Sequence, residues 1–86
     1  MPRVKIKLFA NLREIAGVKE DFVEAETLEE ALREIIKKYP ALEEKIFPDG
    51  ELNKSLNIMV NGIHSELQKE LREGDEIAIF PPVAGG

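Results

Sequence analysis

The stretch TLEEALREIIKKYP, from Thr27 to Pro40, decides the fold class of this chain. Its apolar residues recur three and four positions apart, which is the spacing of one face of an α-helix. They are Leu28, Ala31, Leu32, Ile35, Ile36 and Tyr39. Thr27 is followed three residues later by Glu30, the spacing of a capping box, and Pro40 cannot continue a helix. The stretch therefore predicts one amphipathic helix whose apolar face must pack on another element.

The segments on both sides of this helix alternate between apolar and polar residues, which indicates β-strands buried on one face. The predicted strands are residues 3–8, 19–24, 56–60, a short one from Ile63, and 76–80. Asn61-Gly62 suits a tight hairpin, and helical turns are expected at 10–16 and 42–47. The short link between the first two strands makes them antiparallel neighbours. We therefore expect an α+β domain with one main helix on one face of the sheet and the other face open.

Length and composition limit the possible classes of protein. The 86 residues allow one domain, which we place at residues 1–80, and 43% apolar residues are enough for a compact core. No apolar run approaches the roughly 18 residues of a membrane span. The formal net charge of −5 disfavours nucleic acid as a partner. We expect a cytoplasmic protein that binds neither nucleic acid nor a membrane.

The sequence offers little of its own for catalysis. It has no cysteine and one histidine, His64, so a typical metal site or a Cys/His dyad is not expected. It also lacks a glycine-rich phosphate-binding motif. We therefore predict a chain that is not an enzyme and binds no cofactor itself.

The sequence ends FPPVAGG, from Phe80 to Gly86. Pro81 and Pro82 favour an extended exit from the domain, and no residue after them is bulkier than valine. These features predict a flexible tail over residues 81–86 that enters a narrow site on a partner; the residues that give it access are Pro81, Pro82, Val83, Ala84 and Gly85. The Gly86 carboxylate is ionised at neutral pH and is a poor electrophile, so an acyl-transfer role needs activation by ATP on a partner. A plain apolar terminus that happens to end in glycine is the alternative.

Period-2 alternation also predicts a docking surface at the root of this tail. If Val4, Ile6 and Leu8 face the helix, then Phe9, Met59 and Phe80 gather on the open face with a rim of lysines. Aromatic residues and methionine are enriched at protein interfaces. Scattered apolar residues on an ordinary surface are the alternative.

Three segments resemble the small subunit of molybdopterin synthase, the MoaD-type branch of the ubiquitin-like sulfur carriers. They are LFANLREIAG (8–17), GDEIAIF (74–80) and PPVAGG (81–86). The resemblance implies a β-grasp fold, a mixed sheet whose first and last strands are parallel neighbours. It implies that Gly86 is adenylated by an ATP-dependent activating protein and converted to a thiocarboxylate. The large synthase subunit then uses that sulfur to build the dithiolene of the pterin cofactor.

The resemblance adds Arg13 and the hairpin at His64 as rim contacts of the docking surface, and it gives no signal for residues 40–55. Three other functions stay open. A thiamine-pathway sulfur carrier has the same Gly-Gly end, and a ubiquitin-like protein modifier would be joined through Gly86 to lysines of other proteins. A purely structural domain is the third. The sequence does not distinguish a molybdenum cofactor from a tungsten one.

Overall fold

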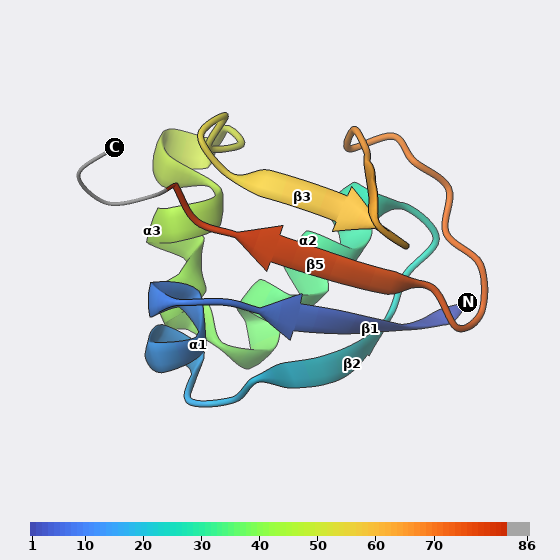
Figure 1. Cartoon of the computed structure of the whole chain (residues 1–86), viewed down its shortest axis with the longest axis horizontal. Coiled ribbons are helices and arrows are strands. Elements are labelled where there is room, and N and C mark those ends of the chain that lie inside the picture. The colour runs from blue at the N-terminus through green and yellow to red at the C-terminus, as the bar shows by residue number, and fades with distance from the viewer. Residues whose placement is uncertain (83–86) are drawn as a thin grey trace.

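Five β-strands form one mixed sheet, and the longest helix crosses one face of it (Figure 1). The computed structural model describes residues 1–82, so the tail residues 83–86 lie outside the described part. The elements are β1 (Arg3–Leu8), α1 (Asn11–Ala16), β2 (Glu20–Glu24), α2 (Leu28–Lys38), η1 (Pro40–Leu42), α3 (Glu43–Ile46), η2 (Pro48–Gly50), β3 (Asn57–Val60), β4 (Ile63–His64) and β5 (Glu76–Phe80). The predicted order of strands around one main helix is confirmed.

The strands lie in the order β2-β1-β5-β3-β4. The first and last strands, β1 and β5, are parallel neighbours, with Leu8 opposite Ile79. The other neighbouring strands pair antiparallel. Because β1 and β5 run in the same direction, the carboxyl ends of both strands lie at the end of the sheet near α1 and α3 (Figure 1). The chain therefore leaves the sheet after Phe80 beside the segment that follows β1.

The predicted capping box at the start of α2 is present in a shifted form. The Thr27 hydroxyl accepts the Glu30 backbone N–H at 3.2 Å, and the Glu30 carboxylate accepts the Glu26 N–H at 2.9 Å. The loop before β5 satisfies two more of the free N–H groups that every helix start carries. Leu28 donates to the Lys69 carbonyl at 2.9 Å, and Glu29 donates to Leu67 at 3.0 Å. The last two bonds tie the amino-terminal end of α2 to the loop that precedes β5.

The core lies between α2 and the sheet. Its fully buried members on β1, β5 and α2 are Val4, Ile6, Leu8, Ile77, Ile79, Leu28, Ala31, Leu32 and Ile35. The predicted inward residues of β1 and the helix stripe are confirmed at these positions. The segment from 40 to 50 also contributes to the core, with Leu42, Ile46 and Phe47 buried. The sequence predicted only a helical turn there.

The hairpin at Asn61-Gly62 has the predicted backbone conformation, with φ of 52° and 82°. Asn61 also joins the turn to β5, because its amide donates to Asp75 and accepts the Glu76 N–H at 3.0 Å. The hairpin thus holds β3 in register with β5. Within residues 1–82, no helix has both the length and the apolar character needed to cross a bilayer.

Candidate docking site at the root of the tail

The open face of the sheet carries the residues that alternate with the core. On β1, Lys5 and Lys7 are partly exposed between fully buried neighbours. Ala78 lies opposite both Lys7 on one side and Met59 on the other. The predicted outward positions are therefore confirmed, and they form rows across the sheet on the side away from α2.

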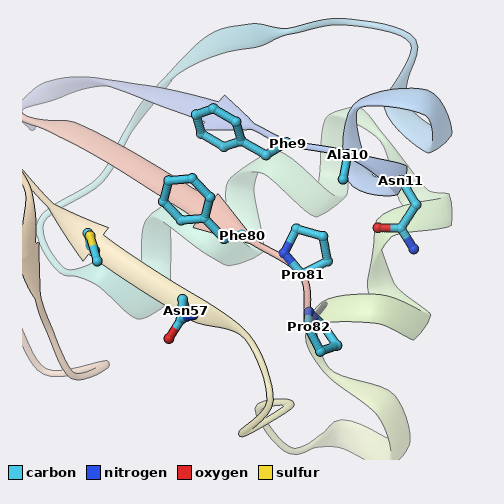
Figure 2. Close-up of a pocket in the computed structure, with 8 residues that line it drawn as sticks. Phe9, Ala10, Asn11, Asn57, Phe80, Pro81 and Pro82 are labelled. Carbon is cyan, nitrogen blue, oxygen red and sulfur yellow. The ribbon is translucent and has the colours of Figure 1, made fainter. Parts of the chain in front are cut away.

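An aromatic pair marks the end of this face where the tail begins. The rings of Phe9 and Phe80 are stacked, with centroids 4.3 Å apart and an interplanar angle of 16° (Figure 2). Arg13 of α1 places its guanidinium carbon 5.7 Å from the centroid of Phe9. The Arg13 Nε also donates to the Leu8 carbonyl at 3.3 Å. The pair is therefore held on both sides, by the parallel strands beneath it and by α1 beside it.

A shallow hollow of about 730 Å³ opens over this stack. The predicted residues that line it are Phe9, Met59, Phe80, Pro81 and Pro82. The structure adds Ala10, Asn11 and Asn57, which the sequence did not point out. Figure 2 shows Pro81 and Pro82 continuing from Phe80, with Asn57 and Asn11 on opposite sides of them. The hollow is thus an apolar floor flanked by two amides.

Ala10 has an unusual backbone where β1 gives way to α1. Its φ of 52° and ψ of −129° lie in a region that residues with a Cβ rarely adopt. Its carbonyl accepts the N–H groups of Arg13 at 3.0 Å and Glu14 at 3.3 Å, so the turn is fixed from the α1 side. Such a conformation costs about 1–3 kcal/mol. This strain lies in the wall of the hollow, directly after Phe9.

The predicted basic rim is neutralised in the structure. The Lys5 amine lies 3.6 Å from Glu20, and the Lys7 amine lies 3.3 Å from Glu76. Each lysine of this face therefore has a carboxylate from a neighbouring strand, since β1 lies between β2 and β5. The rim carries ion pairs rather than a field of positive charge, which corrects the expectation from the sequence.

The two rim residues suggested by the resemblance lie in different positions. Arg13 contacts the Phe9 ring and so adjoins the hollow. His64 lies on β4 opposite Met59, where it is exposed and outside the lining of the hollow. The structure thus brings Arg13 to the aromatic pair and leaves His64 further along the open face.

The hollow presents side chains that suit binding. Aromatic rings, prolines and a methionine offer apolar contact, and the amides of Asn11 and Asn57 can hydrogen-bond a backbone.

The carboxyl groups whose pKa is shifted lie outside the hollow. The Tyr39 hydroxyl lowers the pKa of Asp21, and the Arg72 backbone N–H lowers the pKa of Asp75. Within residues 1–82, no cluster of His, Asp or Glu could hold a metal ion.

A mixed sheet crossed by one helix, with an apolar hollow where the carboxyl-terminal tail leaves, is the architecture of a ubiquitin-like β-grasp protein. The sequence pattern of the ThiS family matches residues 6–86, and the chain belongs to that family of small sulfur carriers and ubiquitin-like modifiers. It is 42% identical to small archaeal modifier protein 1 of Haloferax volcanii over 84 residues, covering 93% of this chain and 97% of that protein. It is 34% identical to the molybdopterin synthase sulfur carrier subunit of Chlamydomonas reinhardtii, covering 98% and 99% of the two chains.

Solved structures give the same fold. The crystal structure of the Haloferax volcanii modifier superposes with a TM-score of 0.93 at 40% identity, covering 98% of this chain and 99% of that one. A second solved structure is the protein–protein complex of subunits 1 and 2 of the molybdopterin-converting factor of Helicobacter pylori. One chain of that complex superposes with a TM-score of 0.66 at 26% identity. That match covers 98% of this chain and 99% of the other. The β-grasp fold expected from the sequence is confirmed.

Proposed function

We propose that this chain is a sulfur carrier for the pterin cofactor of molybdenum or tungsten enzymes, with the Gly86 carboxylate as the site that carries sulfur. The observation that carries the proposal is the Phe9–Phe80 stack under an apolar hollow, at the point where Pro81 and Pro82 leave the sheet. A partner bound in this hollow lies at the root of the tail. The family match, which extends to residue 86, supports the same reading.

The chemistry requires an activating partner. An α-carboxyl group has a pKa of about 3.3–3.7, so at neutral pH it is an anion that resists nucleophilic attack. Adenylation by ATP converts it to a mixed anhydride and releases pyrophosphate. A sulfur nucleophile at the oxidation level of hydrogen sulfide then attacks the acyl carbon, AMP leaves with the bridging oxygen, and a thiocarboxylate remains. In this proposal the chain supplies the carboxylate and the docking surface, and an ATP-dependent adenylating protein supplies the nucleotide site and the catalytic groups.

The large subunit of molybdopterin synthase is the proposed acceptor of the sulfur. The Helicobacter pylori structure contains subunits 1 and 2 of a molybdopterin-converting factor as a complex, which shows that a protein of this fold forms such an assembly. On this chain the hollow and its aromatic floor are the surface proposed for that contact. Methionine and aromatic groups favour such a role, because they are enriched at protein interfaces.

The two proposed partners compete for one tail. A single Gly86 carboxylate cannot occupy two active sites at once, so the adenylating protein and the large subunit are expected to bind in turn. Size-exclusion chromatography of all three proteins tests this expectation. Two separate binary complexes support it, and a stable peak containing all three proteins would contradict it.

Mass spectrometry of the protein isolated from its own cells tests the carrier function. The expected result is a carboxyl-terminal Gly86 whose mass has risen by the difference between sulfur and oxygen. A chain without Gly86 is the matched control, and it should keep its fold while losing sulfur transfer. Full sulfur transfer by that shortened chain would refute the proposal.

The second candidate is a protein modifier joined through Gly86 to lysines of other proteins. The observation that favours it is the 42% identity to small archaeal modifier protein 1 over nearly the whole of both chains. Both candidates share the adenylate, and they differ in the group that attacks it. In the same cell extract, isopeptide-linked conjugates that carry Gly86 would support the modifier, whereas a free thiocarboxylate supports the carrier.

A further inference from the structure

Strand β2 lies at an edge of the sheet, because β1 is its one neighbour in the order. Its hydrogen bonds to β1 can be placed from the bonds that flank the paired region. Leu8 donates to the Lys19 carbonyl at 2.8 Å, and Ala25 donates to the Pro2 carbonyl at 3.0 Å. In an antiparallel pair, bonded and non-bonded residues alternate. Every second residue of β2, beginning with Glu20, therefore turns its backbone groups away from β1.

Glu20, Phe22 and Glu24 are these outward-facing residues. Their N–H and C=O groups form a row along the open edge of the sheet, and such a row is a template for pairing with another strand. Phe22 lies at its centre. A strand added here would bond to both backbone groups of Phe22, and any side chain already bonded to them must be displaced first.

Side chains already occupy both of these groups. The Phe22 N–H donates to Oδ1 of Asp21 at 2.7 Å, and the Phe22 carbonyl accepts from Nζ of Lys38 at 2.9 Å. The same Lys38 amine lies 3.2 Å from Oδ1 of Asp21, which closes a ring of contacts between β2 and α2. The Tyr39 hydroxyl holds the other oxygen of Asp21 at 2.6 Å. The centre of the edge is thus engaged from the α2 side.

Charge opposes self-pairing at the same edge. Two copies of β2 that pair antiparallel about Phe22 place Glu20 of one copy directly opposite Glu24 of the other, twice in each dimer. Like charges directly opposite one another across a strand pair are destabilising. The edge is therefore guarded by two separate features, one on the backbone of Phe22 and one in the flanking side chains.

We propose that Asp21 and Lys38 form a lock that prevents the β2 edges of two copies from joining into one continuous sheet. The partner that the lock excludes is a second copy of this chain, paired antiparallel through residues 20–24. Removing the Lys38 amine frees the Phe22 carbonyl, and the Phe22 N–H is then engaged only by Oδ1 of Asp21, a contact at the exposed edge that an added strand must displace. This inference does not depend on the sulfur-carrier proposal.

The matched pair Lys38→Ala and Lys37→Ala tests the lock. Both variants remove one positive charge from the end of α2, but Lys37 pairs with Glu34 on the same helix. The Lys38 side chain is 48% exposed, so its removal leaves the core intact. Sedimentation equilibrium over a range of concentrations measures self-association. We expect Lys38→Ala to self-associate more strongly than both the wild type and Lys37→Ala.

A third variant separates the effect of the Lys38 contact from the effect of the like-charged Glu20 and Glu24 pairs. Adding Glu24→Lys to Lys38→Ala turns both like-charged pairs into opposite-charged ones, which should strengthen association about tenfold further. In the dimer, amide exchange at Phe22 should slow, because its N–H then bonds to a backbone carbonyl inside the joined sheet and no longer to the exposed Asp21 carboxylate. Equal self-association of Lys38→Ala and Lys37→Ala at every concentration would overturn the lock. So would a wild-type protein that already dimerises through β2.

Discussion

The two faces of the one sheet are built from the same strands and differ in almost every physical respect. On the covered face Ile6, Leu8 and Ile79 are fully buried under α2. On the open face Lys5 and Lys7, one position away along β1, remain partly exposed and pair with carboxylates. Alternation along each strand thus separates the residues that hold the fold from those free to meet a partner.

A surface for binding can therefore change without loss of the fold. Burial of apolar side chains is the main favourable term in folding, and the covered face holds most of it. The open face concentrates its apolar groups at one end, in the stacked pair of Phe9 and Phe80. A substitution on either face should therefore affect one property much more than the other.

The largest expected effect is on the covered face. Ile6→Ala removes a fully buried side chain from the interior strand β1 and leaves a cavity, which should lower the free energy of unfolding by about 2–5 kcal/mol. Lys7→Ala, on the next position of the same strand, removes only a partly exposed ion pair and should cost less than about 1 kcal/mol. Urea denaturation measures both. Equal losses of stability would show that the covered face does not hold most of the folding energy.

The next effect is on binding. Phe80→Ala removes half of the aromatic stack, and the affinity for the proposed partner, the large synthase subunit, should weaken by more than ~1 kcal/mol. Phe22→Ala is the control, because it also truncates an aromatic ring at the surface but lies on the edge strand β2, beside Arg3 and outside the lining of the hollow. Isothermal titration calorimetry gives both affinities, and circular dichroism checks that helix content is kept. Unchanged affinity of Phe80→Ala would return Phe80 to a structural role.

Much of this comparison could be predicted from the sequence, since it depends on periodicity. A period of two placed Ile6 and Ile77 on the covered face, and a period of 3.6 placed Leu32 and Ile35 on the apolar side of α2. Asn61-Gly62 specified its turn because both residues tolerate positive φ. The candidate site follows from the same periodicity, through outward positions at the ends of β1 and β5.

Other features could not be predicted, because they depend on contacts between distant segments. The residue type of Ala10 gives no sign of its positive φ, which the turn between β1 and α1 imposes. Asn57 reaches the hollow only because β3 pairs with β5 opposite Phe80. The burial of Phe47 likewise depends on a distant segment, because the Arg33 guanidinium of α2 covers its ring, with the guanidinium carbon 3.9 Å from the ring centroid.

A smaller effect separates the helix from the open face. Thr27→Ala removes the hydroxyl that accepts the Glu30 N–H, and the loss of such a cap typically costs about 1 kcal/mol. Because the cap holds α2 on the covered face, binding at the hollow should not change. Thr27→Ser, which keeps the hydroxyl, is the control and should retain most of the stability. A weakened affinity of folded Thr27→Ala for the large subunit would show that the two faces are coupled.

The smallest effect concerns the charged group at the rim of the covered face. Asp21 lies opposite Ile6, and its pKa is lowered chiefly by the Tyr39 hydroxyl, with further help from the Phe22 N–H and Lys38. A carboxyl whose pKa is lower when folded contributes stability above its unfolded pKa of about 3.9, and this contribution is lost as the pH falls through the folded value.

The stability of the wild type should therefore decline as the pH is lowered from 5 towards 2, and Asp21→Asn should decline less steeply. Asp75 has a lowered pKa too, so some slope should remain in that variant. Urea denaturation at a series of pH values measures the slopes, with Asp49→Asn in the distant η2 segment as the control. If Asp21→Asn and Asp49→Asn decline equally, the hydrogen bonds at Asp21 do not stabilise the fold. The Asp21 carboxylate would then sit at the margin of the covered face without any stabilising effect from its hydrogen bonds.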